Sequence, residues 1–226
     1  MDIIIDNKET EENLQNLLKA VRLRKNPGVA DLMKKKGIEY HVNLGVSIPE
    51  LHEIANKFRK DHLLALKLWN KKWRETMILA SLVDDPGKVS EEQMDFWTKS
   101  IKNTEIAEQL NSNLWVSTKF AFIKALEWCR GRKHIVRYAG IHLAGRLAIT
   151  EKNALDEMFE PFFEEFNYLA KDILLFGVLY RSLVAFGNRS DDMRKLTLKF
   201  SRDIQTVDSE NALKLGEIVY KDVELQ

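Results

Sequence analysis

The stretch from Leu44 to Trp115 decides the fold. It contains, in order, LGVSIPELHEIANKF (44–58), LLALKLWNKKWRETMILASLVDDP (63–86) and MDFWTKSIKNTEIAEQLNSNLW (94–115). Apolar residues recur every three or four positions in these segments, which is typical of amphipathic helices. Ser47 and Glu50 form a capping-box pattern with a proline between them, which predicts where one helix begins. Each segment is too short to bury its apolar face alone, so the stretch predicts short helices packed on one another.

The same spacing of apolar residues continues towards both ends of the chain. Thr150 is expected to cap an acidic helix that Pro161 kinks or restarts. Residues 173–186 are apolar on nearly every side, which predicts a central, buried helix. No segment alternates in the manner of a strand, so the sequence predicts an all-α protein. Outside the segments quoted, the predicted helices cover 10–24, 29–36, 118–130, 133–149, 190–204 and a last one that Asp208 or Ser209 caps.

Weak internal similarity indicates a repeat architecture. Ala65–Trp69 leads to Met77–Ala80 much as Ala125–Trp128 leads to Tyr138–Ile141, and 136–139 matches the Val-Arg-x-Ala signature of HEAT repeats. We therefore expect one domain over 1–226, an αα-superhelix of HEAT-like (armadillo-type) repeats with about six helix pairs. The second helices of such pairs line a concave face, the usual binding surface. Segments 104–113, 133–149 and 171–187 are expected to share it.

Bulk properties narrow the class of protein. The 226 residues are 45% hydrophobic and 31% charged, which fits a soluble helical protein. The longest apolar run is far shorter than the ~20 residues that span a bilayer. Cys129 is the only cysteine, which excludes an internal disulfide, and the five histidines show no metal-ligand spacing. We expect a cytoplasmic monomer with no membrane partner, no cofactor and no metal; the tryptophans 69, 97, 115 and 128 are expected in the core, like Cys129.

Charge is segregated although the net charge is only +1. Basic residues gather in 22–36, 57–74 and 119–146, and acidic residues in 151–172 and 203–226. Such a distribution permits a basic surface that faces a polyanion, although a solvated helix face is the usual explanation of any one such cluster. Trp73 is the one aromatic residue in a basic context, between Lys72 and Arg74. Its ring is predicted either to stack on a nucleic-acid base or to pack in the core.

These segments resemble the AlkD-type DNA alkylation repair proteins. The resemblance rests on the Gly45–Glu50 loop and cap, the Leu68-Trp69 helix, the 76–86 helix that ends in Asp-Pro, and the 97–113 segment. It runs over about 14–203 and is most specific over 44–145. It implies a HEAT-like superhelix whose basic concave face holds double-stranded DNA. Active members are N-glycosylases that remove cationic alkylated purines such as 3-methyladenine and 7-methylguanine.

The resemblance also implies a set of site residues. The family's Trp-Asp-x-x-Asp step corresponds to Thr104–Glu108, so Glu108 takes the place of the catalytic aspartate and Thr104 that of an aromatic residue. A carboxylate there stabilises positive charge that develops on the deoxyribose. The family's arginine corresponds to Arg137 or Tyr138, two alternatives that the sequence leaves open. Arg181 replaces a second tryptophan. The implied catalytic residues are Glu108 and Arg137, and the implied DNA-binding residues are Thr104, Tyr138, Arg181, Arg132, Lys133, Lys71, Lys72 and Trp73.

These departures predict an altered or lost glycosylase activity. Glutamate is one methylene longer than aspartate, and a shift of about 1 Å in a catalytic group costs on the order of 10²-fold in rate. Loss of the two aromatic residues removes cation–π stabilisation of the lesion. The leading hypothesis is a DNA-binding member of the family with residual activity. The alternative is a protein-binding scaffold without glycosylase activity, which the near-zero net charge favours.

Overall fold

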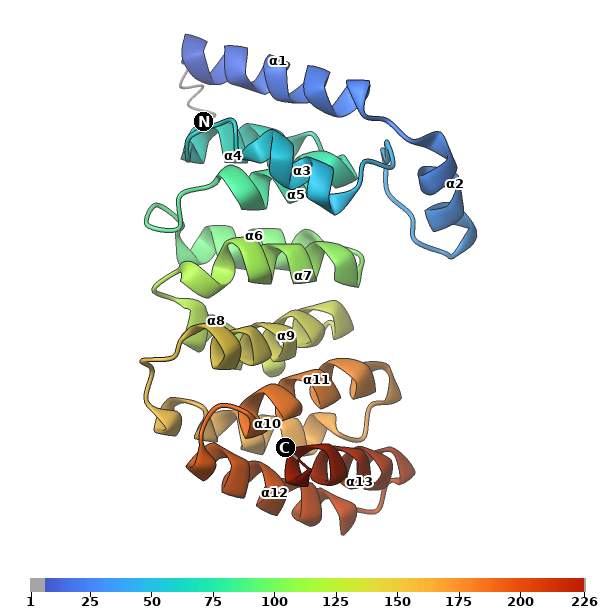
Figure 1. Ribbon diagram of the computed structural model, residues 1–226, viewed down its shortest axis with the longest axis vertical. Helices are drawn as coiled ribbons and strands as arrows, with labels where there is room; N and C mark the ends of the chain where they lie inside the picture. The colour runs from blue at the N-terminus through green and yellow to red at the C-terminus, as the bar shows by residue number, and fades with distance from the viewer. Residues whose placement is uncertain (1–6, 226) are drawn as a thin grey trace. The chain divides into compact units, whose positions relative to one another are not determined.

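The computed structural model describes residues 7–225 and is helical along the chain (Figure 1). Thirteen α-helices and three short 3-10 helices are present within this range. An isolated bridge between Val42 and Trp73 is the extent of strand-like pairing in the described residues. The all-α prediction is confirmed. The chain forms two compact units, residues 1–90 and 91–226; the expectation of a single repeat domain stays a prediction.

Unit 1 contains the first five helices, and the capping box that the sequence predicts starts one of them. Ser47 Oγ accepts the N–H of Glu50, whose carboxylate accepts the N–H of Ser47 in return. The buried Glu75 carboxylate fixes the preceding loop, because it accepts the N–H groups of Leu44 and Val46. The helices are α1 (Lys8–Leu23), α2 (Pro27–Lys35), α3 (Ile48–Ala55), α4 (His62–Asn70) and α5 (Arg74–Val83).

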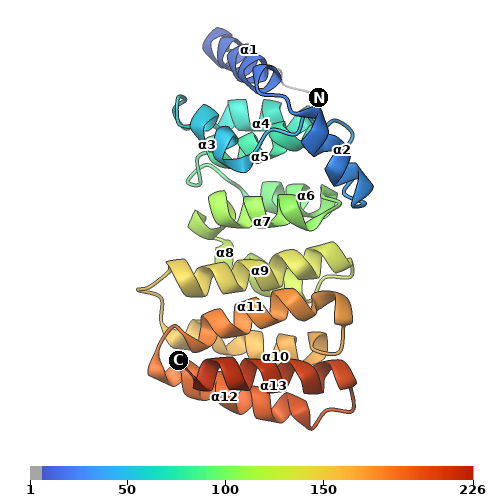
Figure 2. The same cartoon turned by 45° about the vertical axis from the view of Figure 1, so that its right-hand side comes forward.

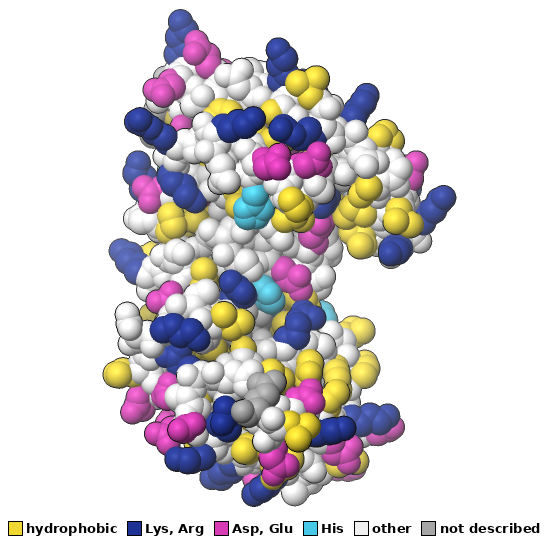
Figure 3. Space-filling model, in the orientation of Figure 1, with side chains coloured by type: hydrophobic (Ala, Val, Ile, Leu, Met, Phe, Trp, Pro, Cys, Tyr) yellow, Lys and Arg dark blue, Asp and Glu magenta, His cyan; other side chains and the backbone are white. Residues whose placement is uncertain are grey.

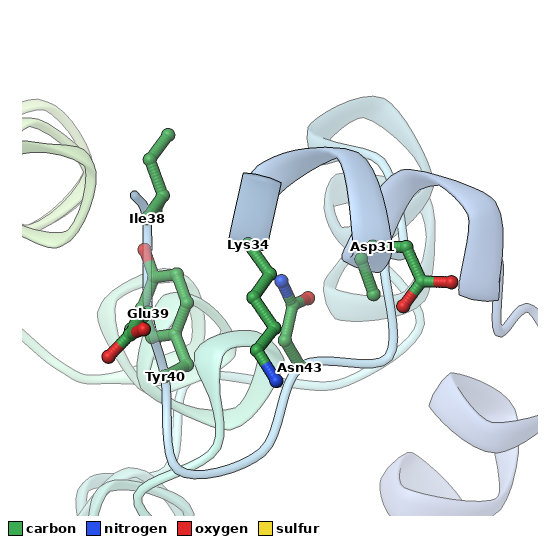
Figure 4. A pocket seen from close by; sticks show the side chains of 7 residues that line it. Asp31, Lys34, Ile38, Glu39, Tyr40 and Asn43 are labelled. Carbon is green, nitrogen blue, oxygen red and sulfur yellow. The ribbon is translucent and has the colours of Figure 1, made fainter. Parts of the chain in front are cut away.

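Helix α2 differs from its neighbours because it has no buried residue. The N–H of its N-cap, Asn26, donates to the Leu44 carbonyl at 2.7 Å. Gly45 permits this close approach, because its φ is +73° and a Cβ on it would lie 2.1 Å from the Asn26 carbonyl oxygen. A cavity of about 360 Å³ lies between α2 and the 38–43 segment. Figure 4 shows its polar walls, which include Lys34, Asp31 and Glu39. The mixed charges of these walls do not select one sign of ligand.

Unit 2 is built around its longest helix, α9 (His134–Thr150). This helix packs against α7 (Thr104–Asn113), α8 (Ala121–Cys129) and α11 (Phe176–Gly187). Figures 1 and 2 both show α7, α9 and α11 following one another side by side. Ser182 on α11 donates to the Ile141 carbonyl, 2.9 Å away, which fixes α11 on α9. The other helices of unit 2 are α6 (Glu91–Ser100), α10 (Glu160–Leu169), α12 (Asp191–Gln205) and α13 (Glu210–Glu224).

Several details of the sequence predictions can now be judged. Pro161 lies in the first turn of α10, so the predicted restart there is confirmed. Ser209 is the N-cap of α13. The predicted cap at Thr150 is wrong, because this residue ends α9 and its hydroxyl donates to the Arg146 carbonyl. The four tryptophans expected in the core, and Cys129, are buried; burial raises the pKa of the Cys129 thiol.

The segment from Ile173 differs most from expectation. It begins with a 3-10 turn, and Ile173 and Leu174 are 69% and 71% exposed. The prediction of a wholly buried helix is therefore wrong for its first turn, although α11 itself buries Leu179, Leu183 and Phe186. The reason is the turn at Asp172, whose side chain accepts the N–H of Leu174. Ile173 and Leu174 therefore belong to this turn and not to α11.

We predict that Gly140→Ala destabilises unit 2. A Cβ at this position on α9 would lie 2.6 Å from the Cys129 nitrogen and 2.7 Å from the Ala125 oxygen, both backbone atoms of α8. Separating two packed helices costs about 1–3 kcal/mol, which denaturant unfolding would measure. Gly177→Ala is the matched control, since this helical glycine on α11 meets no atom closer than 4.0 Å. The control should be neutral or stabilising by up to about 1 kcal/mol; equal losses in both variants would contradict the close-packing argument.

Candidate functional site

Three side chains from three helices meet on the surface of unit 2. Glu108 (α7), Tyr138 (α9) and Arg181 (α11) form a closed hydrogen-bonded group. The Tyr138 hydroxyl donates to Glu108 Oε1 over 2.5 Å. Arg181 Nη2 donates both to the same Oε1, at 3.0 Å, and to the Tyr138 hydroxyl oxygen, at 2.9 Å. Segments 104–113, 133–149 and 171–187 thus each contribute one side chain to this group; that they line one concave face stays a prediction.

The members of this group are exposed to different degrees. The side chains of Glu108 and Arg181 are 39% and 54% exposed, whereas Tyr138 is buried. Burial and the hydrogen bond to Glu108 raise the pKa of Tyr138 to about 12. The hydroxyl therefore stays protonated at neutral pH and remains a donor. One carboxylate oxygen of Glu108 receives both donors, so the second oxygen is available to a ligand.

Asn111 fixes α7 and α9 in this arrangement. It is fully buried, and its amide nitrogen donates to the Ala139 carbonyl at 2.9 Å. The same nitrogen lies 3.0 Å from His142 Nδ1. Because a carbonyl only accepts, the amide nitrogen must face Ala139, and it then donates to the imidazole as well. His142 is thereby held as the neutral tautomer that carries its proton on Nε2.

His142 stacks on Tyr138, with ring planes 7° apart and centroids at 6.4 Å. Burial lowers the pKa of His142 to about 4; the Glu108 carboxylate opposes this shift, and the charges of Arg181 and Arg146 add to it. The imidazole is therefore neutral at physiological pH. It extends the polar group from Glu108 along α9 towards Arg146.

Arg137 and Tyr138, the two alternatives for the family's arginine position, leave α9 in different directions. Tyr138 contacts Glu108. Arg137 instead donates from Nε to the Gly131 carbonyl at 2.6 Å and lines a cavity with Glu165 and Tyr168. One residue along a helix turns the side chain by about 100°, so the structure places Tyr138, and not Arg137, beside the carboxylate.

The other predicted site residues are distributed over both units. Thr104, the first residue of α7, is exposed, as are Arg132 and Lys133 just before α9. Lys71, Lys72 and Trp73 belong to unit 1, where Lys71 and Lys72 are exposed and Trp73 is half-buried. The Arg22 guanidinium lies over the Trp73 ring, 5.4 Å from its centroid. The ring therefore already has a stacking partner.

Sequence reasoning missed Asn111, His142 and Arg146. A signal was present, because Tyr138, His142 and Arg146 follow one another at four-residue intervals and so share one stripe of a helix whose other residues are mostly buried. The wider surface is mixed: Figure 3 shows Lys and Arg side chains interspersed with Asp and Glu on the visible face. Within residues 7–225, no group of three or more His, Cys, Asp or Glu side chains is placed to hold a metal ion.

Comparison with known proteins identifies the family of the chain. Residues 17–161 match the family model described as "DNA alkylation repair enzyme". The chain belongs to the DNA alkylation repair family. No curated protein matches it. None of the described helices of this family member is long and apolar enough to cross a membrane.

One solved structure shares the fold with a TM-score of 0.73 and 15% identity, over 94% of each chain. It is described as belonging to "a new family of proteins related to the HEAT-like repeat DNA glycosylases with affinity for branched DNA structures". At this identity the likeness establishes the fold, so the predicted HEAT-like architecture is confirmed. The matched family region includes Glu108 and Tyr138, while Arg181 lies beyond it.

Proposed function

We propose that the protein binds double-stranded DNA across the α7–α9–α11 face and excises cationic alkylated purines slowly, with Glu108 as the catalytic carboxylate. The observation that carries the proposal is the meeting of Glu108, Tyr138 and Arg181 on that face, at positions that the family resemblance implies. A carboxylate opposes phosphate binding at this face, and action on a cationic base would give it a role there.

Glu108 suits the chemistry of this reaction. Breaking the N-glycosidic bond of 7-methylguanine leaves positive charge on the deoxyribose, because the departing base takes the bonding electron pair and becomes neutral. The free carboxylate oxygen can stabilise that charge and orient the attacking water. No general acid is required, since the base is already cationic before the bond breaks.

The neighbours of Glu108 explain why excision should be slow. Arg181 places a positive charge 3.0 Å from the carboxylate that is meant to stabilise a cation. Tyr138 withdraws further electron density from the same oxygen. Thr104 supplies no aromatic face for the lesion. The arrangement favours binding over chemistry, in keeping with a relative described by its affinity for branched DNA.

The test of binding is a salt series with plain, junction and 7-methylguanine-containing duplexes. Replacing Arg132 and Lys133 together by Gln should weaken all three complexes to a similar extent, because phosphate contacts carry no base information. The slope of log K against log salt should become shallower by up to about two units. Both side chains are exposed just before α9, where Lys133 donates to the Lys99 carbonyl at 3.3 Å.

Lys195 and Lys199, both exposed on α12, provide the matched control pair. Their replacement by Gln removes the same charge from the molecule and should leave the salt slope unchanged. Equal effects of the two pairs would indicate that net charge alone drives binding. Absence of binding by the wild type to every duplex would favour the protein-binding scaffold.

A further inference from the structure

A cavity that contains no member of the Glu108 group lies where the ends of α8 and α10 meet the first turn of α9. Its volume is about 290 Å³, near the lower end of the range for pockets that hold small ligands. Part of its lining is apolar and buried, from Cys129 and Leu169. The rest comes from Arg130, Arg137, Glu165 and Tyr168. An apolar base with polar and aromatic sides suits a small planar ligand that also forms hydrogen bonds.

Arg137 brings unused hydrogen-bond donors to this cavity. Its side chain is half-buried, and its Nε donates to the Gly131 carbonyl at 2.6 Å, which fixes the guanidinium in place. The two Nη atoms have no hydrogen-bond partner among residues 7–225. A guanidinium only donates, and its planar fork matches two acceptors that lie side by side. The ligand must therefore present such a pair of acceptors.

Glu165 provides an acceptor next to these donors. Its Oε1 accepts from Arg130 Nε at 2.7 Å, so the charges of these two side chains are paired. The second carboxylate oxygen has no partner in the part of the chain that the structure describes. Donors from Arg137 and an acceptor from Glu165 favour a neutral group that carries both kinds of partner. A simple anion would be repelled by the carboxylate.

Tyr168 adds an exposed aromatic ring. The residue is 76% exposed, and neither another ring nor a cation stacks on it within residues 7–225. The exposed Ile173 and Leu174 follow a few positions later. Asp172 Oδ2 lies 3.6 Å from His134 Nε2, which places their turn against the start of α9. A ring that is open on this side is suited to stacking on a planar ligand.

The neighbouring residues indicate that this ligand comes from DNA. Arg132 and Lys133, the proposed phosphate contacts, lie between Arg130 and Arg137 in the chain. A nucleobase offers a flat face to Tyr168, and guanine alone presents two adjacent acceptors, O6 and N7, to a guanidinium fork. Guanine also has an N1–H donor for a carboxylate. Base pairing occupies that N1–H and stacking covers the face, so the guanine must be unpaired.

We propose that this cavity binds one unpaired guanine of the DNA. Tyr168 stacks on the ring, Arg137 donates to O6 and N7, and Glu165 accepts from N1–H. The inference rests on the proposed DNA binding and goes beyond it, because it adds a base contact to contacts with phosphates. The protein should therefore prefer DNA that contains unpaired bases to a fully paired duplex.

The first experiment compares a fully paired duplex with duplexes that carry one bulged guanine, adenine, cytosine or thymine. Every bulged duplex should bind more tightly than the paired one, and the guanine bulge roughly tenfold more tightly than the other three, the scale for one bidentate base contact. Arg137→Gln should abolish the preference for guanine. Arg137→Lys should restore little of it, because an ammonium has no planar fork. Arg202→Gln, on the exposed surface of α12, is the matched control and should leave the preference intact.

Tyr168→Ala tests the stacking contact with the same set of duplexes. It should weaken the binding of all four bulged duplexes by roughly tenfold, the scale for stacking one base, and leave the paired duplex unaffected. Tyr168→Phe keeps the ring and should bind like the wild type. Thermal unfolding of each variant checks that the fold is intact.

Dimethyl sulfate, which methylates guanine at N7, gives a second readout of the Arg137 contact. The wild type should protect the bulged guanine from methylation. In the complex with Arg137→Gln the same N7 should be reactive.

The outcomes separate this inference from the proposed function. Equal binding of the paired and bulged duplexes by the wild type overturns the base site and leaves the DNA-binding function standing. A preference for bulges that persists in both Tyr168→Ala and Arg137→Gln does the same, because it indicates recognition of a bent backbone. A reactive N7 in the wild-type complex overturns the contact with Arg137. A wild type that binds none of the duplexes overturns both the inference and the proposed function.

Discussion

Glu108→Gln is expected to lower the single-turnover release of 7-methylguanine by at least about 10²-fold, the scale for losing one preorganised electrostatic group. Glutamine keeps the size of the side chain and can still accept from Tyr138 and Arg181. It lacks the negative charge that stabilises the deoxyribose cation. Affinity for undamaged duplex should stay the same or rise, because the substitution removes a negative charge from a surface that faces phosphates. Base release and duplex binding, measured on the same preparation, check both parts.

Arg181→Gln provides the opposing variant. It removes the positive charge 3.0 Å from Glu108 and should raise the rate of excision while it weakens DNA binding. If the Glu108→Gln variant excises 7-methylguanine at the wild-type rate, another residue is catalytic. If the wild type and Arg181→Gln both bind DNA but neither excises the base, the protein is a binding module on a repair-enzyme scaffold.

Arg189→Ala is expected to destabilise unit 2 by about 3–5 kcal/mol, as is usual when one partner of a buried ion pair is removed. The Arg189 side chain is only 3% exposed. It donates to Asp156 at 2.8 Å and to the carbonyl oxygens of Ala148, Glu151 and Ala154. Its guanidinium also lies 4.4 Å from the centroid of the Phe159 ring. The residue ties the loop between α9 and α10 to the end of α11.

Arg189→Lys separates charge from geometry in this contact. A lysine ammonium keeps the charge but cannot reach several carbonyls and stack on a ring at the same time. Most of the loss in the free energy of unfolding should therefore remain. Arg202→Ala is the control, because Arg202 is exposed and its contact is with Tyr220 at the surface; it should cause no measurable change. A similar melting temperature for Arg189→Ala and the wild type would show that the loop is held by other contacts.

The sequence by itself determined the helical fold, because helix signals are local. The capping box at Ser47, the restart at Pro161 and the cap at Ser209 depend on residues within one turn of each other. The burial of Trp97 and Trp115 follows from apolar spacing in the same way. The position of Glu108 on α7 could be predicted because the family pattern marks it within a single helix.

Only the tertiary structure decided which side chains meet Glu108. Tyr138 lies 30 positions away in the chain and Arg181 lies 73 positions away, so their contact depends on how α9 packs against α7 and α11. The choice between Arg137 and Tyr138 depends on the rotation of α9, which Gly140 sets against α8 and Asn111 sets against α7. Rotation and register between helices are properties of packed surfaces, and no local pattern encodes them.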